Sequence, residues 1–133
     1  MPNQAPVDRS RFRDSKFMTR PGQIEPNELE IAILDRIAQE HPSVRPFLRR
    51  LHVLSRKYTG VGSFTNFRCD DVAEDAPRED LSLNGLIVIP TVPNGLGAVL
   101  FCRDGKPECL ETFTYGDDHW DGVCEGFSIE RAG

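Results

Sequence analysis

The sequence predicts an α+β domain in which an N-terminal pair of helices packs on an antiparallel meander sheet of about five strands. Apolar residues recur at helical spacing between residues 27 and 58, and after residue 60 they gather into short β-branched and aromatic runs. Asn-Gly and Asp-Gly dipeptides, which favour hairpin turns, lie between several of these runs. A chain of 133 residues is long enough for one hydrophobic core, so we expect a single domain over residues 27–133.

The first helix is predicted over Glu28 to His41. Asn27 followed three residues later by Glu30 matches a capping box, and Pro42 stops the apolar stripe. Residues 1–26 contain four prolines and scattered arginines but no apolar periodicity. We therefore expect them to form a flexible N-terminal arm.

The second helix is predicted over Pro46 to Lys57. A proline is tolerated in the first turn of a helix, and Gly60 is a natural stop. The apolar residues of this segment recur at spacings of four, three and four: Phe47, Leu51, Leu54 and Tyr58.

Strands are predicted where β-branched and aromatic residues are concentrated, namely over Val61–Cys69, Leu83–Val92, Leu96–Arg103, Lys106–Tyr115 and Val123–Glu130. We expect hairpin turns at Asn94-Gly95 and at Asp104-Gly105. A third pair of this kind, Asn84-Gly85, indicates that the second strand begins later than Leu83. Asp70 to Asp80 is acidic and contains Pro77, which predicts a surface loop.

Charge is divided unevenly along the chain, whose net charge is −5. Residues 1–68 carry 12 Lys and Arg against 7 Asp and Glu, a balance of +5, whereas residues 69–133 carry 4 against 14, a balance of −10. Such asymmetry bears on the choice of partner rather than on the fold. The alternative is that the two halves simply complement each other across the surface of the molecule.

The composition also restricts the compartment and the class of partner. No apolar run approaches the roughly 20 residues that cross a bilayer, and the N-terminus lacks the apolar core of a secretory signal. We therefore expect a cytoplasmic protein that is not bound to a membrane. Nucleic acid is disfavoured as a direct partner because the net charge is negative and most of the basic residues lie in the arm and the predicted helices.

The four cysteines, Cys69, Cys102, Cys109 and Cys124, are widely and unevenly spaced, with no C-x-x-C pair. A structural zinc site normally presents two close pairs of ligands, so this spacing favours reduced thiols over zinc or a disulfide. We predict four free thiols.

Two acidic segments are candidate sites. The segment from residue 115 to 122 combines aromatic residues, carboxylates and an imidazole, and the loop after residue 69 begins with two further carboxylates. Tryptophan and tyrosine are enriched at the energetic centres of protein interfaces, so we interpret these segments as a binding surface. The candidate residues are Asp70, Asp71, Tyr115, Asp117, Asp118, His119, Trp120 and Asp121.

Alternatives remain for both conspicuous motifs. The 115–122 segment could instead hold a divalent cation, or it could be a polar connection with Trp120 tucked against the sheet, but it lacks the glutamate that closes a calcium loop. His119 could also activate Cys102 or Cys124 in a hydrolase. The glycines at 60 and 62 follow Lys57, the reverse of a phosphate loop, and are better explained as a turn that needs their freedom.

Two blocks, Tyr58 to Phe67 (YTGVGSFTNF) and Leu110 to Trp120 (LETFTYGDDHW), resemble a group of small uncharacterised bacterial proteins. Those proteins carry a Tyr-Thr-Gly-Val-Gly-Phe-Phe-Thr segment and, later, a Leu-Glu-Gly-Tyr-Thr-Tyr-Gly segment near a tryptophan. This sequence departs from them at Ser63, Thr112 and Phe113. The resemblance implies a bacterial protein in which the two blocks lie close together, and it transfers no catalytic residue.

Taken together, these features predict a small acidic, non-enzymatic binding module with a basic protein partner. Size and charge are those of immunity proteins and antitoxins, which inhibit enzymes that act on nucleic acid. The alternative is a small metal-dependent or cysteine hydrolase that uses the segment from Asp117 to Asp121. We expect no cofactor and no bound metal, and the sequence leaves the oligomeric state open.

Overall fold

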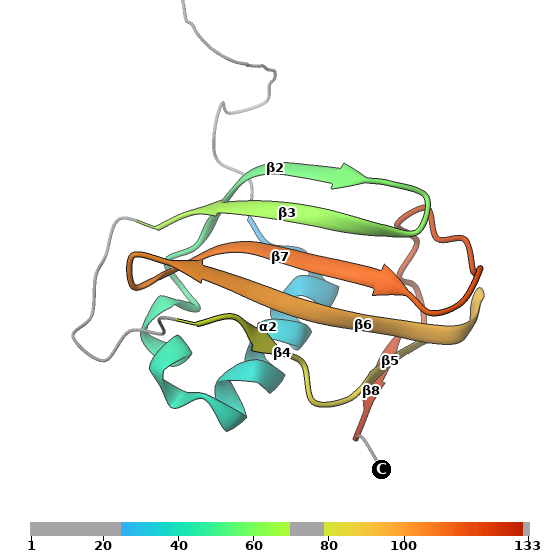
Figure 1. The fold of residues 1–133 in the computed structure, drawn as a ribbon, viewed down its shortest axis with the longest axis horizontal. Coiled ribbons are helices and arrows are strands. Elements are labelled where there is room, and N and C mark those ends of the chain that lie inside the picture. The colour runs from blue at the N-terminus through green and yellow to red at the C-terminus, as the bar shows by residue number, and fades with distance from the viewer. Residues whose placement is uncertain (1–24, 70–78, 132–133) are drawn as a thin grey trace, which may run out of the picture.

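One α-helix and a short 3-10 helix cover one face of an antiparallel sheet in the computed structural model, which describes residues 25–69 and 79–131 (Figure 1). Helix α2 spans Glu28–Glu40 and η1 spans Pro42–Phe47. Within the described residues the sheet has seven strands: β2 (His52–Tyr58), β3 (Gly62–Arg68), β4 (Leu81–Ser82), β5 (Leu86–Ile89), β6 (Val92–Arg103), β7 (Lys106–Thr114) and β8 (Ser128–Glu130). The α+β class is confirmed, but the predicted helix pair and five strands are replaced by this arrangement.

The strands follow the order β2-β3-β7-β6-β5-β8, and every pairing between them is antiparallel. The long strand β6 organises the sheet, because β7 pairs along one edge of it and both β4 and β5 pair along the other. Leu81 of β4 lies opposite Leu100, whereas Ile87 of β5 lies opposite Leu96. β4 and β5 therefore occupy successive stretches of the same edge.

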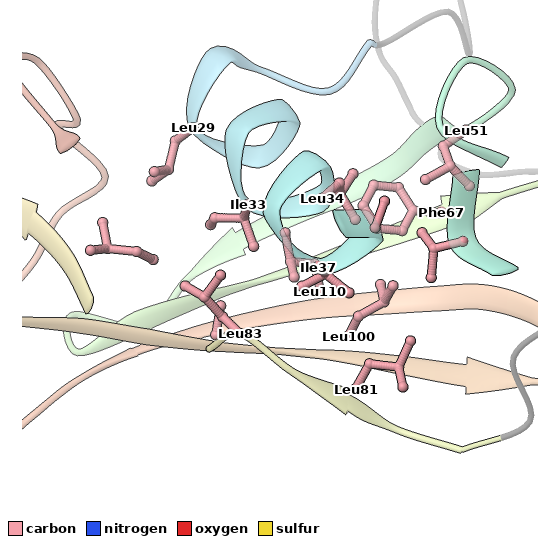
Figure 2. Packing of buried hydrophobic residues seen from close by; sticks show 14 of the residues in the cluster. Leu29, Ile33, Leu34, Ile37, Leu51, Phe67, Leu81, Leu83, Leu100 and Leu110 are labelled. Atoms are coloured by element: carbon pink, nitrogen blue, oxygen red, sulfur yellow. The ribbon is translucent and has the colours of Figure 1, made fainter. Parts of the chain in front are cut away.

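Helix α2 begins at the capping box that the sequence predicts. The Asn27 side chain accepts a hydrogen bond from the Glu30 N–H, and the Glu30 carboxylate accepts one from the Asn27 N–H, both at 2.8 Å. Figure 2 shows Ile33 and Ile37 among the helix side chains that point toward the sheet. In the described part of the chain, no helix is long and apolar enough to cross a membrane.

The predicted second helix, Pro46 to Lys57, is wrong: η1 ends at Phe47, and β2 begins at His52. The first half of the apolar stripe is buried as a helix would bury it, but Leu54 is 58% exposed and Tyr58 is 42% exposed. A bulge between Val53 and Ser55 inserts Leu54 as an extra residue in β2. The bulge interrupts the two-residue alternation that is typical of a strand. The apolar residues are therefore spaced as they would be in a helix.

The turn at Asp104-Gly105 is confirmed. Both residues have positive φ, 52° and 77°, as the tight turn between β6 and β7 requires. The predicted turn at Asn94-Gly95 is wrong, because β5 and β6 are joined by a two-residue turn at positions 90–91.

Asn94 and Gly95 lie inside β6, where they form a bulge. The pairs Ile87↔Leu96 and Ile89↔Val92 enclose one residue on β5 and three on β6, so β6 carries the extra length. Gly95, with φ 74°, supplies the left-handed conformation there. The dipeptide thus has the backbone geometry expected of it, but in a bulge rather than a hairpin turn.

Other strand bounds shift in ways that follow from the same glycines and turns. The predicted Leu83–Val92 strand begins at Leu86, after the Asn84-Gly85 pair as expected, and ends at Ile89, whereas β4 (Leu81–Ser82) precedes it and was not predicted. The predicted Val123–Glu130 strand shortens to Ser128–Glu130. The predicted arm, apart from residues 25 and 26, and most of the predicted 70–80 loop lie outside the described residues.

The two faces of the sheet differ in burial. Along β3, Ser63, Thr65 and Phe67 are buried while the alternating residues are exposed. Figure 2 shows the buried face, where Leu100 and Leu110 lie under the side chains of α2. The helices therefore cover one face, which we call the inner face, and the other is called the outer face below.

Candidate functional site

The connection from Tyr115 to Phe127, which joins β7 to β8, carries most of the predicted site and is called the acidic connection. It includes Asp117, Asp118, Asp121 and Glu125. From residue 107 to residue 130 the sequence contains no lysine or arginine. No ion pair is formed by these four carboxylates within the described residues. Their charge is therefore not neutralised by a neighbouring cation in that part of the chain.

Trp120 anchors the acidic connection to the sheet. Its backbone N–H donates to the Gly60 carbonyl at 2.8 Å, and its indole Nε1–H donates to the Val123 carbonyl at 2.8 Å. Isolated bridges join it to Gly60 and Val61. Only 4% of Trp120 is exposed, so the predicted role of this side chain as a surface anchor for a partner is corrected to that of a buried support.

Tyr58 and Gly122 complete this support. The Tyr58 ring meets the Trp120 ring edge-on, with centroids 5.7 Å apart and planes at 80°. Gly122 packs against the same tyrosine with φ 101°, and a Cβ there would come within 2.6 Å of the ring. Burial raises the pKa of Tyr58 above its ordinary value, so its phenol stays neutral at physiological pH.

Asp118 provides a second anchor, at the bulge in β6. Its Oδ2 accepts a hydrogen bond from the Asn94 N–H at 2.7 Å, and its carbonyl accepts one from the Thr114 hydroxyl at 2.9 Å. Residues inside a bulge are left without a ladder partner, so the Asn94 N–H is available to the carboxylate. The misassigned Asn-Gly dipeptide is therefore part of the site.

The remaining polar side chains of the acidic connection face solvent. Asp117, His119, Asp121 and Glu125 are exposed, and Asp121 Oδ1 accepts a weak hydrogen bond of 3.3 Å from the Val123 N–H. Tyr115 is 44% exposed and lies on the outer face, edge-on to Phe113 at 5.6 Å. The structure thus groups these predicted residues, while Asp70 and Asp71 lie outside the described residues.

The hydrolase alternative depends on a metal-binding group or on a reactive cysteine thiol. Among the described residues, no three His, Cys, Asp or Glu side chains are placed to hold a metal ion. None of the four cysteines, all of which lie in the described part of the chain, forms a disulfide, in agreement with the prediction. Burial, with the charge of Asp80, raises the pKa of Cys102 to about 11, and burial raises that of Cys109 as well. These two thiols are therefore protonated and weakly nucleophilic at neutral pH.

A buried charged cluster under the start of α2 was not predicted. Glu30 accepts two hydrogen bonds from the Arg56 guanidinium and one from the Thr65 hydroxyl, each at 2.7 Å. Burial raises the pKa of Glu30, but hydrogen bonds from Arg56, Thr65 and Asn27 together with the charge of Arg56 outweigh it, and the pKa is lowered. The sequence analysis assigned Arg56 to a second helix, whereas Arg56 belongs to strand β2, and this pair was therefore missed.

The glycines at 60 and 62 lie in and beside the turn between β2 and β3, as predicted, and both also allow a close approach of neighbouring groups. Gly60 has φ 91° and lies against the His119 ring. At Gly62 a Cβ would fall 2.1 Å from the Thr112 carbonyl oxygen, so only glycine lets β3 approach β7 so closely there.

No protein-family model matches the chain, and no curated protein or solved structure matches it at a significant level. The two blocks that resemble bacterial proteins, residues 58–67 and 110–120, do lie side by side. β3 pairs with β7 from Gly62↔Phe113 to Asn66↔Cys109, and Trp120 bridges to the Gly60 turn. The proximity expected from the resemblance is therefore present in the fold.

Proposed function

We propose that this chain is a non-enzymatic binding module that presents the acidic connection to a basic protein partner. One observation carries the proposal: exposed carboxylates that form no ion pair within the described chain lie on a backbone that Trp120 and Asp118 hold in place. A surface that is already ordered loses little conformational entropy when it binds. Three exposed carboxylates, Asp117, Asp121 and Glu125, would make the first contacts.

Electrostatics favour a basic partner over a neutral one. Complementary charge raises the rate of encounter and excludes partners of like charge more than it adds to final affinity. A basic enzyme that acts on nucleic acid presents such a surface, so an inhibitor of the immunity or antitoxin kind, acting in the cytoplasm, is the class that we favour. Direct binding of nucleic acid would set these carboxylates against phosphates of the same sign.

The proposal is tested by comparing what three forms of the protein capture from a lysate of the native host. The site variant combines Asp117→Asn, Asp121→Asn and Glu125→Gln. The control variant combines Asp35→Asn, Glu79→Gln and Glu130→Gln, which removes the same charge from other exposed positions. We expect a basic protein that the wild type and the control retain and that the site variant loses.

Asp118 is left unchanged in both variants because its hydrogen bond to Asn94 supports the fold of the connection. Far-UV circular dichroism and thermal melting of each variant should show that folding is unaffected. If every captured protein binds the site variant as strongly as it binds the control, the acidic connection is not the binding surface.

A further inference from the structure

The outer face of the sheet is a second surface, which meets the acidic connection at Tyr115. No described element covers it, and it presents apolar side chains on neighbouring strands. Leu54 of β2 is 58% exposed and Phe64 of β3 is 37% exposed. Phe113 of β7 and Phe101 of β6 are half-buried at positions that alternate with the residues of the inner face. An uncovered apolar sheet face of this kind is typical of an interface.

Two opposite charges stand on this face in one cross-strand row. Lys57 lies opposite Phe64, and Phe64 lies opposite Glu111, so the three residues occupy successive strands. Adjacent strands are about 4.8 Å apart, so the Cα atom of Phe64 lies midway between those of Lys57 and Glu111, which are about 10 Å apart. Neither Lys57 nor Glu111 has an ion-pair partner among residues 25–69 and 79–131.

We propose that the outer face binds a second copy of this chain, with a two-fold axis running along β3 between the two sheets. Rotation about that axis leaves β3 facing β3 and sets β2 of one copy over β7 of the other. Phe64 then meets the partner's Phe64, and Lys57 faces the partner's Glu111 on both sides of the axis. The row is complementary to itself under this rotation, as a two-fold interface requires.

The neighbouring row fits the same axis. Ser55 lies opposite Asn66, which lies opposite Cys109, and the bulge puts the exposed Leu54 beside Ser55. The rotation brings Leu54 over β7 at the height of the partner's Cys109, an apolar contact. Two sheets that pack face to face in this way lie about 10 Å apart, a gap that the side chains of both faces fill.

The test is a pair of charge reversals measured separately and together. The mass of the wild type in solution, measured by light scattering or sedimentation, should be twice the 15.0 kDa of one chain. Lys57→Glu sets two glutamates against each other and Glu111→Lys sets two lysines against each other, so each variant alone should be monomeric. An equal mixture of the two variants restores both opposite-charge contacts and should form a mixed dimer.

Matched controls separate this interface from a general effect of charge. Arg45→Glu and Asp35→Lys make the same reversals at exposed positions on η1 and α2, and both proteins should remain dimeric. A wild type that stays monomeric at high micromolar concentration would overturn the proposal. So would a dimer that both reversals leave intact, or two monomeric variants that fail to associate when mixed. These measurements involve no basic partner, so their outcome is independent of the proposed function.

Discussion

Trp120 joins the acidic connection to the sheet through two hydrogen bonds and one aromatic contact. The sequence identifies the segment around it as a site but does not show which way the indole points, because its neighbours are distant in the chain. Gly60 and Tyr58 come from the β2–β3 hairpin, about 60 residues earlier. The exposed carboxylates, in contrast, could be predicted from composition alone, since a run of aspartates without cations is costly to bury.

Replacing Trp120 should therefore lower the stability of the free protein, and any loss of binding should follow from that. Trp120→Ala should lower the free energy of unfolding by about 3–5 kcal/mol, as for other large buried side chains. Trp120→Phe keeps an aromatic ring beside Tyr58 but loses the indole hydrogen bond to Val123, which costs about 1 kcal/mol beyond the change in size. Urea denaturation of the free protein measures both values. A Trp120→Ala protein as stable as the wild type would contradict the buried position of the indole.

At the scale of elements, α2 is tied to β2 and β3 by the Glu30–Arg56 pair and by Thr65. The same carboxylate closes the capping box, so one side chain both starts the helix and fixes it to the sheet. The cap was predictable because it depends on residues three apart. The ion pair was not predictable, because 26 residues separate its members. In addition, Arg56 belongs to a strand whose apolar spacing resembles that of a helix.

This pair predicts a specific dependence of stability on pH. The pKa of Glu30 in the folded protein lies below its ordinary value of 4.5, so its contribution is complete above about pH 4.5 and is lost as the pH falls through the folded value. Glu30→Gln should cost about 3 kcal/mol or more at pH 7, since it leaves the largely buried Arg56 unpaired. Its stability should also fall less than that of the wild type below pH 4.5.

Denaturation of both proteins between pH 7 and pH 3 tests this prediction. Arg56→Gln and the double variant complete a double-mutant cycle that isolates the energy of the pair. Parallel losses of stability for the wild type and Glu30→Gln across that range would show that Glu30 does not contribute to acid sensitivity.

The sequence predicted the element types well where a local pattern determines them. It predicted them poorly where the pairing of two strands determines them. The capped helix α2, the Asp104-Gly105 turn and strands β3, β6 and β7 follow from short-range patterns. The errors fall at bulges, in β2 and at Asn94-Gly95 in β6, where one strand carries residues that its neighbour does not match. A bulge is a property of two paired strands, so the sequence of one strand does not reveal it.

At the scale of the whole molecule, the acidic connection and the outer face are two surfaces that meet at Tyr115. The acidic connection carries carboxylates on an anchored backbone, whereas the outer face presents apolar side chains beside the opposite charges of Lys57 and Glu111. A dimer formed through the outer face would carry two acidic connections. A partner with two basic sites could then gain avidity without any new contact.

The central claim is that electrostatic attraction to the acidic connection speeds the association of a basic partner. Its most direct test is to measure the association rate at several salt concentrations. With the captured partner immobilised, the rate for the wild type should fall about tenfold or more as salt shortens the Debye length from about 30 Å to about 8 Å. The variant with Asp117→Asn, Asp121→Asn and Glu125→Gln should associate slowly at low salt and change little as salt rises. An association rate that is the same for both proteins and independent of salt would contradict the claim.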